Sequence, residues 1–237
     1  MTDAQGDIYA PGFNHRCQSR HWLSPSTRVL SAAVANNRNL PPSRTGAGLQ
    51  LAQAHSNISI EALDIGDNEQ IAALAEHYRD LAIDVLISNA GIYGPKGYSL
   101  ANLDFAAWQQ VMDINVLAPA KLAQAFFPHL ARADSGVFAA LSSKVGSHTE
   151  NTKGGGYIYR SSKAALNSVV KSLSNDWREH GIKTVSLHPG WVRTQMGGPN
   201  ALIDASESAR GLKQVIDSLQ MSQSGGFYNY RAEQLPW

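Results

Sequence analysis

The feature that most constrains the fold is an alternation of short apolar runs with amphipathic helical patterns, which begins near Ser56 and continues to the end of the chain. Short apolar runs are typical of strands buried on both faces, and the helices between them are the connections that parallel strands require. The alternation therefore predicts an α/β fold, in which a single doubly wound parallel sheet is covered by helices on both faces.

Strands are predicted over the ranges 57–63, 83–87, 136–141, 183–187 and 227–230. Apolar residues three and four positions apart predict helices over 67–78, 104–130, 157–180 and 204–219. Asp67 is placed to cap the first helix, Pro119 is expected to bend the long second one, and Gly181 is placed to end the third.

Composition excludes several classes of protein. The chain has 237 residues with 20 basic and 19 acidic side chains, so its net charge of +1 gives no electrostatic footprint for nucleic acid. Its one cysteine, Cys17, excludes a disulfide framework and a thiolate metal cluster. No apolar run approaches the roughly 18 residues of a membrane span. We expect no nucleic-acid partner, no membrane span and no metal site, and we take the cytoplasm as the default location.

Tyr159 and Lys163 stand four residues apart at the start of a predicted helix, so their side chains share one face. An ammonium group beside a phenol favours the phenolate, which would lower the tyrosine pKa towards the working pH and allow acid-base catalysis. The same spacing also arises by chance in a chain with 8 tyrosines. The pair becomes evidence for a catalytic site only together with the polar residues that are predicted to lie near it.

Small and polar residues follow the neighbouring strands, at the sheet edge where open α/β folds bind ligands. Ser143 follows one predicted strand, and Ser88, Asn89, Ala90 and Gly91 follow another. A serine at such a place can hold a substrate oxygen, although capping a loop is its commoner role. Asn115 lies inside a predicted helix, where asparagine is unfavourable without a polar partner. Together these signals predict one catalytic site.

With these motifs the sequence resembles the short-chain dehydrogenase/reductase family over about 56–237, and within it a C-factor-like group of small reductases. The family's catalytic tetrad matches four positions: Asn115, Ser143, Tyr159 and Lys163. The segment SNAG at 88–91 resembles its NNAG motif, with Ser88 in place of the first asparagine, and PGWVRT at 189–194 matches its PG-x-V-x-T segment. The resemblance implies a Rossmann-like fold and a homodimer or homotetramer.

The resemblance also implies a reaction, in which a hydride passes between NAD or NADP and a small carbonyl or alcohol substrate. Tyr159 would move the proton, Ser143 would polarise the substrate oxygen, Lys163 would hold the nicotinamide ribose, and Asn115 would anchor a water. Further cofactor contacts are implied for Asp64, Asn89, Ala90, Gly91, Pro189, Gly190, Val192 and Thr194. His188, directly before Pro189, is a possible base, but a structural role is the favoured interpretation.

The N-terminal stretch 1–55 does not continue the alternation, and we expect no strand from it to join the sheet. Between Asp7 and Glu61 it holds five arginines but no lysine and no acidic residue. The family's glycine-rich phosphate loop is not readable there, since the Gly46 and Gly48 pair follows no strand. We therefore expect the chain to divide into an aberrant or poorly ordered N-terminal segment, 1–55, and a short-chain dehydrogenase/reductase domain, 56–237, with the N-terminal βαβ unit disrupted.

A shift of reading frame is one hypothesis for this stretch. Permitted codons for residues 12–22, GFNHRCQSRHW, encode VLITGANRGI when read one base later, and this resembles the family's first strand and phosphate loop. Residues 34–46 likewise permit WRIIATCRHPEQA in the same frame, and this resembles the family's second strand. The arginine that would follow that strand favours NADP over NAD. A transit peptide is disfavoured, because its removal would leave the domain incomplete.

Three functions stay open on the sequence alone. The first is an NAD(P)-dependent oxidoreductase that acts on a carbonyl or an alcohol. The second is an inactive relative that serves in signalling or binding and keeps only the fold. The third is a defective product that folds poorly, because the loss of two strands exposes an apolar sheet edge.

Overall fold

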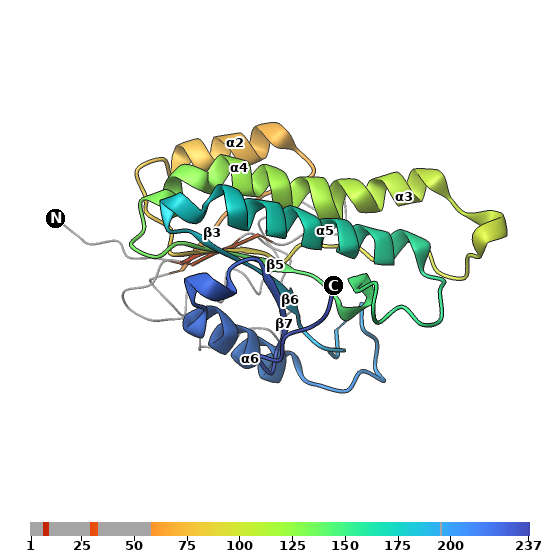
Figure 1. The fold of residues 1–237 in the computed structure, drawn as a ribbon. Helices are drawn as coiled ribbons and strands as arrows, with labels where there is room; N and C mark the ends of the chain where they lie inside the picture. The colour runs from red at the N-terminus through yellow and green to blue at the C-terminus, as the bar shows by residue number, and fades with distance from the viewer. Residues whose placement is uncertain (1–6, 10–28, 33–57, 195) are drawn as a thin grey trace.

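The computed structural model describes residues 7–9, 29–32, 58–194 and 196–237 (Figure 1). The strands are β1 (Asp7–Tyr9), β2 (Val29–Ala32), β3 (Ile58–Ile60), β4 (Val85–Ser88), β5 (Val137–Leu141), β6 (Lys183–His188) and β7 (Gly226–Asn229). The α-helices are α2 (Asn68–His77), α3 (Phe105–Met112), α4 (Ala118–Ala131), α5 (Tyr157–Asp176) and α6 (Ala205–Ser218). Short helical turns are η2 (Leu100–Asn102), η3 (Asp113–Leu117), η4 (Lys144–Gly146), η5 (Arg178–His180) and η6 (Met221–Gln223).

The seven strands form one parallel sheet in the order β3-β1-β2-β4-β5-β6-β7. Helices α2, α4 and α5 cover one face of this sheet and α6 covers the other (Figure 1). The predicted α/β fold with a doubly wound parallel sheet is therefore confirmed.

Alternate side chains of the central strands supply two cores, because successive residues of a strand point to opposite faces. Leu86 of β4 and Phe138 of β5 pack with residues of α2, α4 and α5 in the larger core. Val85 and Val137, their neighbours in sequence, pack with Leu212 and other residues of α6 in the second core. Burial on both faces explains why these strands read as continuous apolar runs.

The helix predicted over 104–130 is confirmed in its extent, because helical backbone runs without interruption from Phe105 to Ala131. Its middle differs from a regular α-helix: α3 ends at Met112, the π-helical turn η3 follows, and α4 begins at Ala118. Pro119 lies in the first turn of α4. The change to π geometry therefore precedes the proline, and it contains Asn115.

The prediction that residues 1–55 contribute no strand is wrong at β1 and β2, which both join the sheet. In the usual doubly wound order the first strand lies beside the fourth and the second beside the third. Here β2 pairs with β4, and β1 pairs with β3. This exchange falls in the part of the chain where the sequence predicts a disrupted βαβ unit. The boundary at 55/56, the Gly46 and Gly48 pair and most of the segment read in the shifted frame lie outside the described residues.

Among the residues that the structure describes, no helix has both the length and the apolar character needed to cross a bilayer. The same residues contain no cluster of three or more histidine, cysteine, aspartate or glutamate side chains suited to a metal ion.

Candidate active site

The carboxyl ends of β4, β5 and β6 lie at the same edge of the sheet, because the strands are parallel and in register. The chain leaves these ends at Ser88, Leu141 and His188. The residues that directly follow, together with η3 and the first turns of α5, form the candidate site.

Asn115 is fully buried in the π turn η3 and has its polar atoms satisfied by two segments. Its Oδ1 accepts a hydrogen bond from the Ile92 N–H at 2.9 Å, and its Nδ2 donates to the Ile92 carbonyl at 2.9 Å. Nδ2 also donates to Ser162 Oγ on α5 at 3.0 Å. The polar partners expected for a helical asparagine are thus present, and they join the loop after β4 to α5.

Lys163 is buried on the face of α5 that meets the sheet, and its Nζ donates to the Leu141 carbonyl at 2.8 Å. Burial lowers the pKa of this lysine to about 8. Two glycines allow its close packing: a Cβ on Gly91 would lie 3.4 Å from Nζ, and a Cβ on Gly146 would lie 2.8 Å from the Lys163 carbonyl carbon. The loops after β4 and β5 therefore enclose the lysine.

Tyr159 lies one turn before Lys163 on α5, and the lysine Nζ is 5.7 Å from the centroid of its ring. Burial raises the pKa of Tyr159 to about 12, while a hydrogen bond with the Ser143 hydroxyl acts in the opposite direction. The expectation that Lys163 lowers this pKa is not met in this structure. The cost of burying a phenolate is the largest effect on the phenol, and the lysine ammonium is directed to the Leu141 carbonyl.

The two serines after β5 have different surroundings. Ser142 is buried, and its Oγ donates to Asn167 Oδ1 at 2.6 Å. Ser143 caps η4, where its Oγ accepts a hydrogen bond from the Val145 N–H at 3.4 Å, and its hydroxyl reaches Tyr159. The structure therefore brings Ser143 and Tyr159 together and assigns Ser142 to packing between β5 and α5.

The predicted cofactor residues fall in three places. Asn89, Ala90 and Gly91 continue β4 directly into the site, and Ala90 is buried. Asp64 is exposed after β3, where its Oδ1 accepts from the Gly66 N–H at 2.8 Å. A Cβ on Gly66 would lie 3.2 Å from Asp64 Oδ1 and 3.6 Å from Ile114 Cδ1, so the loop that carries Asp64 lies near the residue before Asn115.

The third group is the segment 189–194, which leaves the end of β6. The Pro189 carbonyl accepts from Ser208 Oγ at 2.6 Å, which ties the segment to α6. Gly190 has a φ of +84°, which favours glycine, and Val192 forms a parallel bridge with Ile203. Thr194 closes the segment, since its Oγ1 accepts from the Gly197 N–H at 3.1 Å.

His188 ends β6 beside Lys144. Burial, together with the charge of Lys144, lowers the pKa of this imidazole to about 4. The side chain is therefore neutral at neutral pH.

A nicotinamide ribose fits the residues at this edge of the sheet. An ammonium group has three N–H donors, and among the described residues Lys163 gives one of them to a carbonyl, Leu141. The remaining donors suit ribose hydroxyls.

Sequence reasoning missed the aromatic neighbour of the candidate acid. The rings of Tyr93 and Tyr159 stack with their centroids 4.7 Å apart and their planes inclined by 26°. Tyr93 follows Gly91 by two positions, but no periodicity in the sequence connects it with α5. Its closeness to Gly91 was the available signal.

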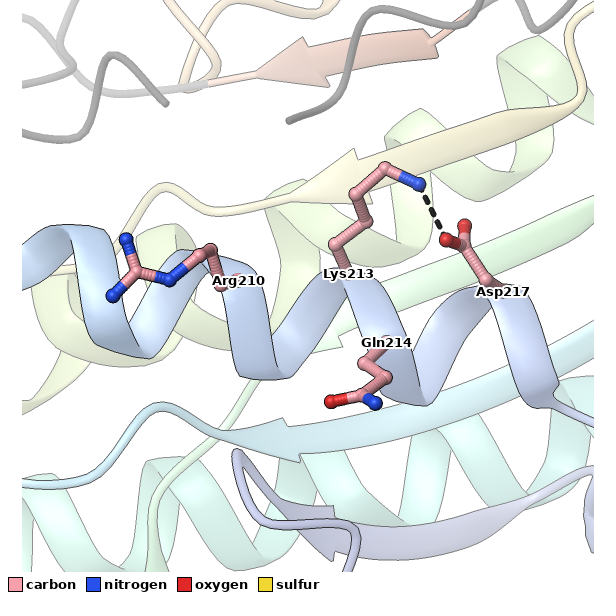
Figure 2. Close-up of a pocket in the computed structure, with 4 residues that line it drawn as sticks. All are labelled: Arg210, Lys213, Gln214 and Asp217. Carbon is pink, nitrogen blue, oxygen red and sulfur yellow. Dashed lines mark hydrogen bonds and ion pairs between the residues drawn. The ribbon is translucent and has the colours of Figure 1, made fainter. Parts of the chain in front are cut away.

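Two cavities detected elsewhere are not lined by any of the four tetrad residues. One, of about 310 Å³, is shallow and lies along α6, where Lys213 pairs with Asp217 beside Arg210 and Gln214 (Figure 2). The other, of about 220 Å³, lies between residues 145–148 and the first turns of α5, next to the loop that follows Ser143.

Comparison with known proteins places this geometry in a family. Residues 33–202 match the family model described as short chain dehydrogenase. The chain is 44% identical over 155 residues to "C-signal" of Myxococcus xanthus. The aligned region covers 65% of this chain and 93% of that protein.

Solved structures agree with the family model. The carbonyl reductase Sniffer of D. melanogaster superposes with a TM-score of 0.85 at 31% identity, covering 98% of this chain and 99% of that one. The NADPH-bound carbonyl reductase from chicken fatty liver superposes with a TM-score of 0.83 at 30% identity, covering 98% of this chain and 99% of that one. The chain belongs to the short-chain dehydrogenase family of NAD(P)-dependent oxidoreductases.

Proposed function

We propose that the protein is a carbonyl reductase that uses a nicotinamide cofactor, with Tyr159 as the proton donor. The observation that carries the proposal is the contact between the Tyr159 phenol and the Ser143 hydroxyl, with buried Lys163 one turn further along α5. A protonated phenol beside a serine hydroxyl can donate its proton to a carbonyl oxygen, as reduction of a carbonyl requires.

Each tetrad residue has a role that follows from its contacts. The Ser143 hydroxyl, which reaches Tyr159, would hold the carbonyl oxygen in line with the phenol. Lys163 would bind the ribose hydroxyls and stabilise the phenolate that remains after proton transfer. Asn115 would hold the loop after β4 against α5 and so fix the space that the nicotinamide enters. When bound, the reduced nicotinamide supplies the hydride.

We propose NADP rather than NAD as the cofactor. The support is the bound NADPH of the similar chicken reductase and the arginine that the shifted frame would place after the second strand. The roles of Asp64, Asn89 and the segment 189–194 in holding the cofactor are part of the same proposal. Competition of the two cofactors in a binding titration tests it, and NADPH is expected to bind at least about tenfold more tightly.

We also propose that the segment from about residue 9 to about residue 48 is translated out of frame. The exchanged positions of β1 and β2 in the sheet support this. The nucleotide sequence of codons 1 to 60 tests it. A glycine-rich loop encoded one base later is the expected result, and its absence from that frame would end the hypothesis.

A second candidate is a signalling or binding protein that keeps the fold without turnover, and the 44% identity to a protein named C-signal favours it. The thermal melt separates the candidates. The reductase is expected to gain several degrees in Tm with NADPH, because a ligand of the folded state stabilises it. A cooperative melt that does not respond to NADPH or NADH would favour the second candidate, and the lack of a cooperative melt would favour a defective product.

The direct test of the reductase is NADPH oxidation by a panel of aldehydes and ketones. Tyr159→Phe is expected to lower kcat by about a hundredfold or more. Tyr157→Phe is the matched control, because Tyr157 lies on the same helix and is exposed. If no substrate oxidises NADPH, or if both variants keep full activity, the proposal fails.

We propose that two or more copies of the chain assemble through α3 to α5. The support is a pair of exposed apolar side chains on α3 and η3, Phe105 and Leu117. Sedimentation measures the assembly, and Phe105→Glu with Leu117→Glu is expected to yield a monomer.

A further inference from the structure

We infer that Tyr93 is a positioning residue, which fixes the plane of the Tyr159 phenol and shields one face of it from water. The inference rests on the proposed function of Tyr159 as proton donor, and it adds a residue from the loop after β4 to the site.

Two ammonium groups lie near the stacked rings. Tyr93 stacks on Tyr159 with a centroid distance of 4.7 Å. Lys96 Nζ lies 5.6 Å from the centroid of Tyr93, and Lys163 Nζ lies 5.7 Å from the centroid of Tyr159. Ring stacking and cations near ring faces are both attractive, so these contacts favour one orientation of the phenol.

The segment that carries Tyr93 is held at both ends. Before it, both main-chain groups of Ile92 are hydrogen-bonded by the side chain of Asn115. After it, the Tyr98 hydroxyl accepts from the Ile158 N–H at 3.2 Å, in the first turn of α5. The anchors place the Tyr93 ring against the same helix that carries Tyr159, so the stacking does not depend on a free loop.

Gly94 brings the segment even closer to its neighbours. Its φ is +82°, and a Cβ built on it would lie 2.9 Å from Val111 Cγ2 and 3.4 Å from Ile158 Cγ2. The backbone next to Tyr93 therefore packs directly against α3 and α5, and this leaves the tyrosine little freedom to move away from the phenol.

The cover has a chemical consequence. Burial is the largest cause that raises the pKa of Tyr159, and the Tyr93 ring covers part of that phenol. Tyr93 itself is 39% exposed, so its removal opens the face of Tyr159 without emptying a core position. Loss of the cover is expected to hydrate the phenol, ease its ionisation and loosen its orientation.

The experiment compares Tyr93→Ala and Tyr93→Phe by NMR of protein labelled with ¹³C at the tyrosine ζ carbon. Tyr159→Phe assigns the signal of Tyr159. In the unsubstituted protein and in Tyr93→Phe this signal is expected to stay in the protonated state between about pH 8 and about pH 11. In Tyr93→Ala it is expected to begin to ionise within this range, about one unit earlier. Tyr157→Ala, which removes a tyrosine of similar exposure, is the control, and it is expected to leave the titration of the Tyr159 signal unchanged.

Kinetics provide the second readout. Tyr93→Ala is expected to lower kcat about tenfold with little change in the KM for NADPH, and Tyr93→Phe to restore at least half of kcat, because the stacked ring is what positions the phenol. An unchanged Tyr159 titration in Tyr93→Ala, or equal losses in the alanine and phenylalanine variants, would overturn the inference. Failure of the proposed function is a separate result: the unsubstituted protein would then lack turnover, while the NMR titration would still test the stacking.

Discussion

The side chain of Asn115 and the backbone of Ile92 form a reciprocal pair of hydrogen bonds, each of 2.9 Å, between the π turn η3 and the loop after β4. The same amide reaches Ser162 on α5 at 3.0 Å. One buried side chain therefore links the loop that carries Tyr93 to the helix that carries Tyr159 and Lys163.

Replacement of this side chain is expected to affect stability and activity together. Asn115→Ala leaves the partly buried N–H of Ile92 without its partner and empties a fully buried position, and it is expected to cost about 2 to 4 kcal/mol of the free energy of unfolding. Urea denaturation measures the loss. Asn175→Ala, at an exposed position of α5, is the control and is expected to cost less than about 1 kcal/mol. Equal losses in the two variants would contradict the structural role of Asn115.

Because Lys163 is buried with a lowered pKa, the free energy of unfolding is expected to rise with pH. Burial lowers its pKa from 10.5 to about 8, so between these values the unfolded chain still binds the proton that the folded chain has lost. Raising the pH then favours the folded state, by up to about 3 kcal/mol across the window.

The comparison of this protein with Lys163→Met isolates that effect, because other titrating groups are common to both. The free energy of unfolding of both proteins is measured by urea denaturation at several pH values from about 8 to about 10. The value for the lysine protein is expected to rise relative to the value for Lys163→Met as the pH rises. A difference that stays constant over this range would mean that Lys163 is not buried as the structure has it.

The serines after β5 are expected to separate stability from catalysis. Ser143→Ala is expected to lower kcat about a hundredfold, since its hydroxyl reaches the phenol, and to leave the Tm nearly unchanged. Ser142→Ala leaves buried Asn167 Oδ1 without its donor and is expected to cost about 1 to 3 kcal/mol, with kcat within about twofold. Kinetics and thermal melts of both variants test the pair, and an exchange of the two outcomes would refute the assignment.

A side chain added at Gly91 is expected to disturb the site by steric contact. A Cβ at this position would lie 3.2 Å from Asn115 Oδ1 and in ordinary contact, 3.4 Å, with Lys163 Nζ, so Gly91→Ala is expected to displace the Asn115 amide and to lower kcat about tenfold. Gly97→Ala is the control, because its Cβ would meet nothing within 4 Å, although its φ of +77° costs about 1 kcal/mol of stability. Activity lost in the control as well would point to strain in the loop instead.

Sequence patterns predict the sheet and most helices because burial on both faces leaves continuous apolar runs, as in β4 and β5. The spacing of Tyr159 and Lys163 places both on α5, as the structure has them. Local patterns do not reveal the π turn around Asn115, and the side-chain partners of Asn115, Ile92 and Ser162, are remote in sequence. The pKa of Tyr159 was not predictable either, because it depends on three-dimensional burial.

Transfer of deuterium tests the central claim most directly. The protein is incubated with an aldehyde or ketone and with NADPH that carries deuterium at the reactive ring carbon, and the alcohol is analysed by mass spectrometry. The account predicts one deuterium on the former carbonyl carbon, formed by this protein and by Tyr157→Phe but reduced about a hundredfold or more in Tyr159→Phe. Labelled alcohol formed equally well by Tyr159→Phe, or no labelled alcohol from any carbonyl tested, would contradict it.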